Sequence, residues 1–361
     1  MSKLAIILED MRLGGPQKQL IYFLQECSKS NSSKKYLVIL PKQSKKKLSK
    51  FLNLNKIKIK ELDIQYLSRY SITKYIKYFY KEFKQIKDSL RNIEKVYIAG
   101  GTSSLKSLIF SIILKKQIYF HIHDARTNKI LKIILFFLSF FIKKIFFASK
   151  SSRDYYSFLS NNPNKIILRS SIDPYYFKNF PKKKNIFNIG IISNINPDKN
   201  IELLIDIVKN INNKKIKFIL VGKLFSSQIN YFRNKLNLLN EIKNNIKWHK
   251  NIDDPKEIIK SFDLYICTSK NESLPLSILE ALSMSIPVIS TNVGDVSYVL
   301  NKIKCGFIAK PNCKNFVEKI KLLYSNRNKL KKLSINAKKN ILKNFNIKNY
   351  KRSLENELFK K

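Results

Sequence analysis

Residues 268–294 read TSKNESLPLSILEALSMSIPVISTNVG, and this stretch is the most informative one for the fold. An apolar run ends near Thr268, a loop carries Glu272, and Pro275 stands where a helix can begin, because the missing N–H of proline costs nothing there. The helix ends before Pro287, and a second apolar run follows it. Strand, loop, helix and strand in this order predict part of a parallel α/β sheet.

Two carboxylates flank the start of this helix. Glu280 lies just over one turn inside it, roughly 7–8 Å along the axis from Pro275. The free N–H groups and the dipole of a helix N-terminus favour phosphate. Carboxylates accept hydrogen bonds from hydroxyls, so Glu272 and Glu280 suit a ligand laid out as sugar, diphosphate and ribose. The alternative interpretation is an exposed loop Glu and an ordinary helical Glu, since this spacing is common by chance.

The alternation of strand and helix extends over the whole chain and predicts parallel sheets covered on both faces. We expect one domain over 1–180, a second over 181–340, and a C-terminal helix within 341–361 that packs on the first domain. The basic loop Pro174–Lys184 is expected to link the domains. The expected strands are Leu4–Leu8, Tyr36–Leu40, Lys95–Ala99, Ile118–His121, Lys144–Ala148, Ile186–Ile192, Lys217–Val221, Ile246–His249, Leu264–Thr268 and Val288–Ser290.

Glycine is scarce in this chain. Average usage predicts roughly 25 glycines in a chain of this length, and there are eight. Such a composition keeps glycine where backbone geometry or close approach requires it. Six of the eight follow or end an apolar run, which is where ligands bind in open parallel sheets. The eight are Gly14, Gly15, Gly100, Gly101, Gly190, Gly222, Gly294 and Gly306.

The net charge is large and positive. Lys plus Arg is 70 and Asp plus Glu is 25, which gives +45 over 361 residues. Such an excess is typical of proteins that bind nucleic acid or anionic membranes. Only nine of the basic residues are Arg, the residue favoured for bidentate recognition of bases and phosphates. The lysines accompany many Ile and Asn residues, whose codons are also AT-rich, so the charge indicates nucleic-acid binding only weakly.

Three further patterns bear on compartment and membrane. The four scattered cysteines indicate free thiols of a cytosolic protein, and the N-terminus MSKLAIILEDM lacks the pattern of a signal peptide. The apolar run Ile133–Ile142 is too short to span a bilayer and is expected to be a buried helix. The segment Ile72–Leu90 predicts a helix with apolar residues at 72, 75, 76, 79, 83, 86 and 90 and lysines at 74, 77, 81, 84 and 87. Its basic face either contacts solvent or docks on anionic lipid.

Residues 268–294 resemble the C-terminal motif of the retaining, metal-independent glycosyltransferases of family four. That family carries E-G-F-P/G-L-x-x-L-E-A, then G-x-P-V-V and a further Gly, and this chain has E-S-L-P-L-S-I-L-E-A, S-I-P-V-I and Gly294. The resemblance implies an α/β GT-B fold, with two Rossmann-like domains facing each other across a cleft. It makes 1–180 the acceptor-side domain and 181–340 the nucleotide-sugar-binding domain. Further matches are Gly14–Gly15 in LGGPQKQL, His123–Asp124, Ala148–Arg153, Ser171–Phe177 and Gly222 in FILVGK.

The resemblance also implies roles for individual residues. Glu272 contacts hydroxyls of the transferred sugar, and His123 lies beside that sugar. Lys199 matches the lysine that neutralises the diphosphate, and Glu280 binds the ribose. A hydrogen-bonded His at a strand end is the alternative interpretation of His123, and His121 is expected in the core. The other donor-binding positions are Gly15, Asn194, Gly222, Leu274, Pro275, Leu276 and Ser277. No cofactor and no metal are expected, and the chain contains no D-x-D.

The chain departs from the family pattern at four positions. Asn194 stands where the family has the Arg that binds the diphosphate, and Lys223 beside Gly222 is a candidate to replace its charge. Lys250 stands where the family has a Gly near the base. Ser273 and Ser285 replace two further glycines of the motif. These departures leave open a weakened enzyme or one with a different donor.

The resemblance implies an EC 2.4 hexosyltransferase-type reaction, the transfer of a sugar from a UDP- or GDP-sugar to an acceptor hydroxyl with retention. Catalysis would rest on positioning and on stabilisation of the leaving diphosphate. We expect a cytoplasmic protein, peripheral on the inner face of an anionic membrane, that uses lipid-linked or saccharide acceptors in polysaccharide or lipopolysaccharide assembly. The alternatives are a GT-B protein that binds nucleotide sugars without turnover and a basic nucleic-acid-binding protein.

Overall fold

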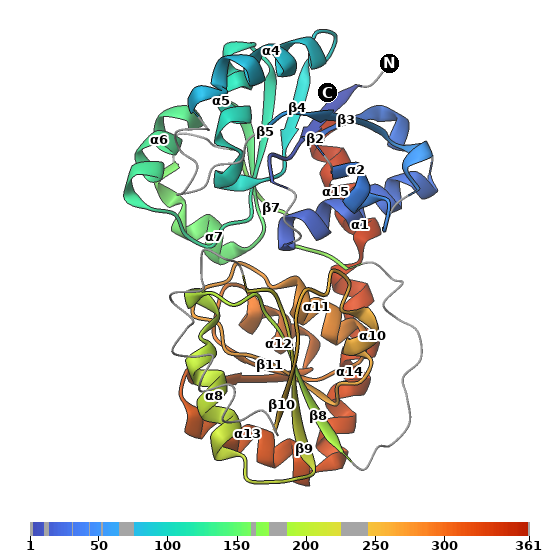
Figure 1. Ribbon diagram of the computed structural model, residues 1–361, viewed down its shortest axis with the longest axis vertical. Coiled ribbons are helices and arrows are strands. Elements are labelled where there is room, and N and C mark those ends of the chain that lie inside the picture. Colours follow the sequence, from blue (N-terminus) through green and yellow to red (C-terminus); the bar gives the residue numbers. More distant parts are fainter. Residues whose placement is uncertain are drawn as a thin grey trace. The chain divides into compact units, whose positions relative to one another are not determined.

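Two parallel sheets organise the chain, one in each of two units (Figure 1). The first unit is Met1–Ser170 with Ile347–Lys361, and the second is Ser171–Asn346. The expected linker Pro174–Lys184, and with it the domain boundary at 180/181, lies outside the described residues. The computed structural model describes residues 3–10, 14–30, 32–42, 44–51, 53–64, 76–159, 164–172, 186–224 and 245–359.

The first unit holds a seven-stranded sheet in the order β3-β2-β1-β4-β5-β6-β7. Its strands pair in parallel throughout. They are β1 (Leu4–Ile7), β2 (Tyr36–Pro41), β3 (Lys58–Leu62), β4 (Lys95–Ile98), β5 (Gln117–Ile122), β6 (Ile142–Phe147) and β7 (Lys165–Ile167). The helices are α1 (Gly15–Lys29), α2 (Ser44–Leu48), α4 (Phe79–Ser89), α5 (Leu105–Ile113), α6 (Lys129–Ser139), α7 (Lys150–Tyr155) and α15 (Ile347–Phe359).

The second unit holds a six-stranded parallel sheet in the order β10-β9-β8-β11-β12-β13. Its strands are β8 (Phe187–Ile192), β9 (Ile216–Val221), β10 (Ile246–His249), β11 (Leu264–Cys267), β12 (Val288–Thr291) and β13 (Gly306–Ala309). The helices are α8 (Ile201–Asn210), α10 (Lys256–Ile259), α11 (Leu276–Ser283), α12 (Val296–Ile303), α13 (Cys313–Ser325) and α14 (Arg327–Phe345).

Each sheet is covered by helices because its strands are apolar on both faces. In the first unit, α4 and α5 join β1, β4, β5 and β6 in one core. In the second unit, α8 and α13 cover one face of the sheet, and α11 and α12 pack with α14. Both strand orders reverse direction from their first strand, as in Rossmann folds, so the carboxyl ends of β1 and β4, and of β8 and β11, mark the switch points.

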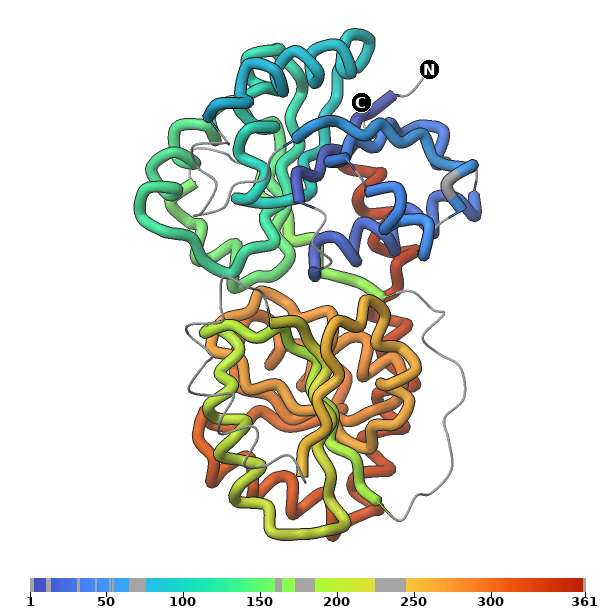
Figure 2. The backbone as a smooth tube through the Cα atoms, viewed as in Figure 1, coloured from blue at the N-terminus to red at the C-terminus, as the bar shows by residue number. Residues whose placement is uncertain are grey.

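The C-terminal helix α15 belongs to the first unit and contacts α1. Figure 2 shows the red end of the chain beside the blue N-terminal helix. The Tyr36 hydroxyl donates a hydrogen bond to Glu355 at 2.7 Å, and Lys144 pairs with Glu357 at 2.7 Å. These contacts fix the last segment of the chain to a unit otherwise built from its first half.

The ten expected strands all correspond to strands of the structure, and β3, β7 and β13 were not predicted. Two of the missed strands lie at the edges of the first sheet, and β3 alternates exposed and half-buried residues because of its lysines. An edge strand has fewer neighbours than a central strand and needs fewer apolar residues, so these strands lack the apolar run from which a strand is predicted.

The helix predicted over Ile72–Leu90 is confirmed from Phe79 to Ser89. Residues 72–75 lie outside the described residues, and α4 begins only at Phe79. Ile86 and Leu90 are fully buried, and Phe83 contacts Phe110. Ile76, by contrast, is 67% exposed. It precedes the turn at Tyr78 that starts α4, so it does not share the apolar face of that helix.

The prediction of a buried helix over Ile133–Ile142 was wrong. The helix α6 ends at Ser139, and Ile142 already belongs to β6. Only Leu135 and Ser139 of α6 are buried, whereas Ile133, Phe137, Phe140 and Phe141 are exposed. Composition alone does not reveal how many sides of a helix have neighbours, and α6 packs on one side only.

Candidate functional site

The switch point of the second sheet collects the predicted diphosphate and sugar residues. β8 and β11 are adjacent, and the chain leaves them toward α8 and α11. Lys199 lies in a short 3-10 helix, Pro197–Lys199, after β8, and Glu272 lies in the loop after β11. Ligands of such sheets bind outside the carboxyl ends of the two strands that flank the switch point.

Lys199 and Glu272 form an ion pair there. The Lys199 ammonium donates to Glu272 Oε1, and the Ser269 hydroxyl donates to the same oxygen at 3.0 Å. Both charged side chains are partly exposed, at 22% and 16%. Burial disfavours the charged lysine, but the attraction of the Glu272 carboxylate outweighs it, so the pKa of Lys199 is raised. The site therefore holds one fixed cation and one carboxylate within reach of solvent.

Hydrogen bonds clamp the Glu272 loop to the turn that carries Lys199. The Lys270 N–H donates to the Asp198 carbonyl at 2.6 Å, and the Asn271 side chain donates to the Asp198 carboxylate at 3.0 Å. The Thr268 hydroxyl donates to the Lys199 carbonyl at 3.0 Å. Three bonds between two short segments fix the relative positions of the ammonium and the carboxylate.

The loop after β12 supports the Glu272 loop from a second side. Gly294 has a φ of +51°, and a Cβ on it would lie 1.8 Å from the Ser273 carbonyl oxygen. The Asp295 N–H donates to that carbonyl at 2.9 Å, and the Thr291 hydroxyl donates to the Ser269 carbonyl at 2.6 Å. Glycine is thus required at 294 both for backbone conformation and for close approach.

The start of α11 differs slightly from the expectation. Pro275 is the N-cap residue, and the helix begins at Leu276 without a side-chain cap. Leu274 and Leu276 are buried, and the Ser277 hydroxyl accepts a hydrogen bond from Tyr265 at 2.8 Å. Uncapped N–H groups at this end remain for an anion, and the buried leucines hold the backbone in place.

Glu280 lies on α11, one turn beyond this start, and its side chain is fully buried. The sequence predicted that it binds a ribose. A ribose hydroxyl can contact the Glu280 carboxylate only after neighbouring side chains move. Glu280 therefore lies near the start of α11, as predicted, but its side chain is not exposed to a ligand.

Asn194 and Gly222 lie on the other side of the switch point, after β8 and β9. Asn194 Oδ1 accepts a hydrogen bond from the Lys223 N–H at 3.1 Å. A Cβ on Gly222 would lie 1.8 Å from the Ser193 carbonyl oxygen. The Lys223 ammonium pairs with Asp253 at 2.6 Å. The candidate to replace the missing Arg charge is therefore already engaged by a carboxylate.

In the first unit, the other expected site residues follow β1 and β5. Gly15 begins α1, and a Cβ on it would meet no atom within 4 Å. His123 is half-buried, and burial lowers its pKa to about 4, so the imidazole is neutral at pH 7. Asp124 accepts hydrogen bonds from the Thr102 N–H at 2.8 Å and from its hydroxyl at 2.7 Å. The carboxyl end of β5 therefore carries a neutral His123 beside Asp124, whose carboxylate is hydrogen-bonded to Thr102.

His121 is fully buried, as predicted. Its ring stacks on that of His123 with centroids 3.9 Å apart, and its Nδ1 is 2.6 Å from the Tyr97 hydroxyl. The Tyr97 hydroxyl in turn lies 3.5 Å from that of Tyr350 on α15. The core therefore sets the orientation of the His123 ring through His121.

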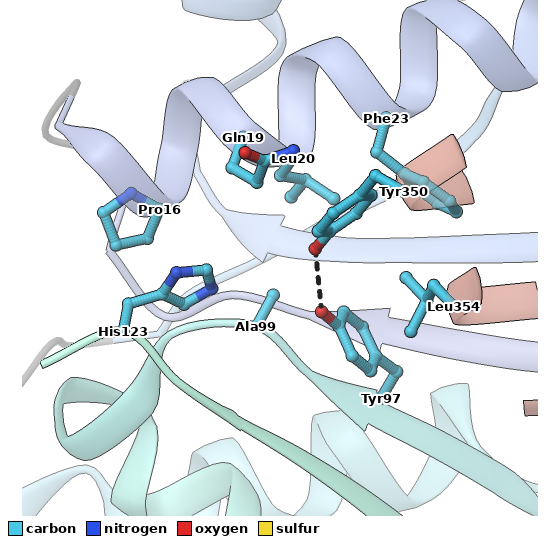
Figure 3. Close-up of a pocket in the computed structure, with 9 residues that line it drawn as sticks. All are labelled: Pro16, Gln19, Leu20, Phe23, Tyr97, Ala99, His123, Tyr350 and Leu354. Carbon is cyan, nitrogen blue, oxygen red and sulfur yellow. Dashed lines mark hydrogen bonds between the residues drawn. The ribbon is translucent and has the colours of Figure 1, made fainter. Parts of the chain in front are cut away.

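A pocket in the first unit opens beside His123. Figure 3 shows Pro16 and Leu20 of α1 on one side and Ala99 and His123 on the other. Tyr350 of α15 forms a further part of the lining. The lining is largely apolar, with the imidazole as a polar group at one edge.

Sequence reasoning missed several residues of these sites. Asp198 and Ser269 hold the Glu272 loop, and Tyr97 supports His121. Ser269 lies three residues before Glu272, and Asp198 lies one residue before Lys199. Their closeness in sequence to a predicted site residue could have indicated both. Tyr97 had no such signal, because its contact depends on the pairing of β4 with β5. Within the described ranges, no group of three or more His, Cys, Asp or Glu is placed to hold a metal ion.

Ser285 occupies a glycine position of the motif with a φ of +61°. Its buried hydroxyl oxygen has no hydrogen-bond partner among the described residues. We expect Ser285→Gly to raise the free energy of unfolding by about 0.5–1 kcal/mol, because glycine adopts this conformation without steric cost. Thermal unfolding should then shift upward by about 1–4 °C.

The control for this prediction is Ser283→Gly, two residues earlier within α11. The Ser283 hydroxyl donates to the Glu280 carbonyl at 2.6 Å, so glycine there should lower the melting temperature. A decrease with both variants would mean that Ser285 is not strained.

The sequence of this chain has known relatives. Residues 174–340 match the family model of glycosyl transferases group 1. The O-antigen biosynthesis glycosyltransferase WclY of Escherichia coli is 28% identical over 167 residues, 42% of this chain and 44% of that protein. The capsular polysaccharide biosynthesis glycosyltransferase CapH of Staphylococcus aureus is 30% identical over 190 residues, 51% of each chain. The aligned part therefore spans only about half the length of these relatives.

Solved structures resemble the whole chain. The Anabaena protein HepE in complex with UDP and glucose has a TM-score of 0.84 at 16% identity, over 100% of both chains. WaaG, a glycosyltransferase involved in lipopolysaccharide biosynthesis, has a TM-score of 0.69 at 12% identity, over 99% of this chain and 100% of that one. Identity this low supports the fold alone, and the predicted α/β GT-B fold is confirmed.

Proposed function

We propose that this protein is a glycosyltransferase that moves a sugar from a nucleotide sugar to an acceptor hydroxyl, with retention at the anomeric carbon, as in family four. The observation that carries the proposal is the pair Lys199–Glu272 beside the uncapped start of α11. A cation, free N–H donors and a carboxylate acceptor gather at a switch point, where such sheets bind ligands. Together they match the diphosphate and the sugar of one nucleotide sugar.

In the absence of donor, Lys199 and Glu272 neutralise each other. A bound diphosphate competes for the ammonium, and sugar hydroxyls donate to the carboxylate that it leaves. As the bond between sugar and diphosphate breaks, negative charge grows on the leaving oxygen. Lys199 and the N–H groups of α11 are already oriented to stabilise it, so little reorganisation is needed in the transition state.

The remaining roles follow the same logic. The family resemblance assigns the Gly15 backbone to the donor phosphates, and a Cβ at this position would meet no atom within 4 Å. The family resemblance assigns His123 to the transferred sugar, and its lowered pKa leaves the imidazole neutral, so that it can exchange hydrogen bonds with sugar hydroxyls. Glu280 contacts the ribose once the site opens. The chain's own groups supply the stabilisation of charge, and we propose that no metal or cofactor takes part.

The donor and the pathway are proposed from the relatives. HepE is known in complex with UDP and with UDP-glucose, so a UDP-sugar is the first candidate, with a GDP-sugar second. The names of WclY and CapH point to O-antigen and capsular polysaccharide assembly. We propose a role in bacterial cell-surface polysaccharide or lipopolysaccharide synthesis, at the cytoplasmic face of the membrane, with a lipid-linked or saccharide acceptor. Among the described residues, each helix is either too short or too polar to span a bilayer.

Donor hydrolysis tests the proposal. UDP-, GDP-, ADP- and CMP-sugars are offered to the full chain without added metal, and both binding and slow hydrolysis are measured. We expect one donor to be hydrolysed, with the anomeric configuration of the released sugar retained. Binding to no donor, together with salt-sensitive binding to RNA or DNA, would overturn the proposal in favour of a nucleic-acid-binding protein.

The replacement of the family Arg by Asn194 favours a second candidate, a protein that binds nucleotide sugars without turnover. Asn194 is uncharged and accepts a hydrogen bond from the Lys223 N–H. The Lys223 ammonium is paired with Asp253, so it reaches the diphosphate only if that ion pair opens. Donor binding without hydrolysis, both in the wild type and in Glu272→Ala, would support this candidate and reject the enzyme.

A further inference from the structure

The outer side of α6 presents a contiguous apolar surface. Ile130, Ile133, Phe137, Phe140 and Phe141 are each 58–71% exposed. They follow at spacings of three, four, three and one residues, which places them on one side of the helix and its C-terminal turn. We call these five residues the α6 apolar face. Scattered exposed apolar residues are common, but a contiguous group of this size marks an interaction surface.

The helix that carries this face is anchored on its opposite side. Leu135 is buried in the core of the first unit, and Leu131, Ile134 and Leu138 pack against that core. Asn128 caps the helix by accepting a hydrogen bond from the Leu131 N–H at 2.8 Å. The α6 apolar face is therefore held in a defined orientation, on a helix that is apolar on both sides. Such a helix is normally buried on both sides, and Figure 1 shows α6 at the outside of its unit.

The charge around this face is of one sign. From Ala125 to Arg153, both included, the sequence contains no Asp or Glu and seven basic residues. Lys129 begins the helix and Lys143 follows its C-terminal turn, and both are exposed. Lys132 points to the rings of Tyr155 and Phe158, with its Nζ 4.3 and 5.4 Å from their centroids. Aromatic and aliphatic side chains flanked by lysines are typical of helices that lie in the interface of an anionic membrane.

A second copy of the chain is the main competing occupant. Two chains of net charge +45 each repel one another. In a symmetric dimer through this face, the lysines that flank α6 in one copy would also lie near the same lysines of the other copy and repel them. An anionic bilayer reverses the sign of that interaction and solvates the apolar side chains as well. Charge complementarity therefore favours lipid over self-association.

We propose that the α6 apolar face inserts into the headgroup region of an anionic bilayer and anchors the first unit there. This assigns a surface to the membrane association proposed above. It does not depend on sugar transfer, because none of the five residues belongs to the candidate site. It also differs from the docking expected through the basic side of Ile72–Leu90, where Lys81 already pairs with Asp63 at 3.0 Å.

Vesicle sedimentation of the full chain tests this proposal. We compare vesicles of phosphatidylcholine alone with vesicles that also contain phosphatidylglycerol. The double variant Phe137→Ser with Phe141→Ser should lower partitioning into the anionic vesicles by at least about tenfold. The matched control is Leu322→Ser with Ile335→Ser, two exposed apolar residues of the second unit, which should leave partitioning unchanged. Equal binding of the wild type and the Phe137/Phe141 double variant would overturn the proposal.

A fluorescent probe distinguishes insertion from purely electrostatic attraction. Phe137→Trp should shift its emission to the blue on anionic vesicles and be quenched by lipids brominated in their acyl chains. The native Trp248 lies in the second unit, with its indole N–H donated to the Gly222 carbonyl, so the wild type provides the background. Salt-sensitive binding without a shift at position 137 would contradict insertion.

Analytical ultracentrifugation and donor hydrolysis complete the test. A concentration-dependent dimer that the Phe137/Phe141 double variant abolishes, in a protein that does not bind vesicles, would assign the face to self-association instead. Donor hydrolysis is measured without vesicles, where the double variant should match the wild type. Failure of the glycosyltransferase proposal would appear in that assay alone, and failure of the membrane proposal in the vesicle assays alone.

Discussion

Replacing Lys199 by alanine is expected to lower kcat/KM for donor turnover by about two to three orders of magnitude. The ammonium is the fixed cation at the switch point of the second sheet, held there by Glu272 and by the hydrogen bonds between its turn and the Glu272 loop. The loss of a preorganised charge partner of the leaving group typically costs about 10²–10³-fold in rate. The effect should fall mainly on kcat, because the charge it stabilises is greatest in the transition state.

The fold should survive this substitution. Lys199 and Glu272 are both partly exposed, so water and the Ser269 hydroxyl satisfy the carboxylate when the ammonium is gone. Retained donor binding in the presence of a strongly reduced rate would separate a catalytic defect from unfolding. Glu272→Ala should lose turnover similarly, and the double variant should lose less than the sum, because the two residues act as a unit.

The matched control is Lys223→Ala. Lys223 is also half-buried, lies at the same edge of the same sheet, and pairs with a carboxylate, Asp253. If its ammonium remains engaged by Asp253, its loss should lower kcat/KM by less than about tenfold. An equal loss for the two lysines would show that the charge at the diphosphate comes from β9 as well, and that Lys223 compensates for Asn194.

The part of this site that could be predicted from the sequence is the part encoded locally. Glu272, Pro275 and Gly294 fall within one stretch whose strand, loop and helix follow from apolar runs and prolines. The short distance between Lys199 and Glu272, which are 73 positions apart, follows only once β8 and β11 are known to be neighbours. The resemblance to a family indicated that Lys199 and Glu272 lie in one site. The periodicity of apolar residues did not indicate it.

The sequence predicts where helices form better than it predicts how deeply they are buried. The apolar run at Ile133–Ile142 predicts a helix correctly, but a helix needs neighbours on both sides to be buried, and those neighbours come from distant parts of the sequence. The same limit applies to Glu280, whose complete burial results from packing around α11 that the spacing of the two glutamates does not encode. The C-terminal helix was expected to pack on the first domain, but its contact with α1 in particular depends on the two ends of the chain and is not encoded locally.

Gly294→Ala is expected to lower kcat/KM by at least about 100-fold while the protein remains folded. A Cβ at this position would lie 1.8 Å from the Ser273 carbonyl oxygen and 2.6 Å from that of Glu272, and the φ of +51° strains any other residue. The neighbouring atoms belong to backbone, so the loop itself must move. A displacement of about 1 Å in a positioning group can cost 10²-fold in rate. Kinetics of donor hydrolysis and thermal unfolding, measured on the same preparation, check both statements.

Gly306→Ala provides the control that separates loop displacement from general destabilisation. Its Cβ would lie 2.0 Å from the Val288 carbonyl oxygen, between β12 and β13 and away from the Glu272 loop. Both variants should lower the melting temperature, since each forces backbone apart, but only Gly294→Ala should reduce kcat/KM per folded molecule. If the two variants reduced activity equally, the carboxylate would not depend on the loop after β12. The separation of these effects follows from one asymmetry: Gly294 touches the backbone that carries Glu272, whereas Gly306 touches only the sheet.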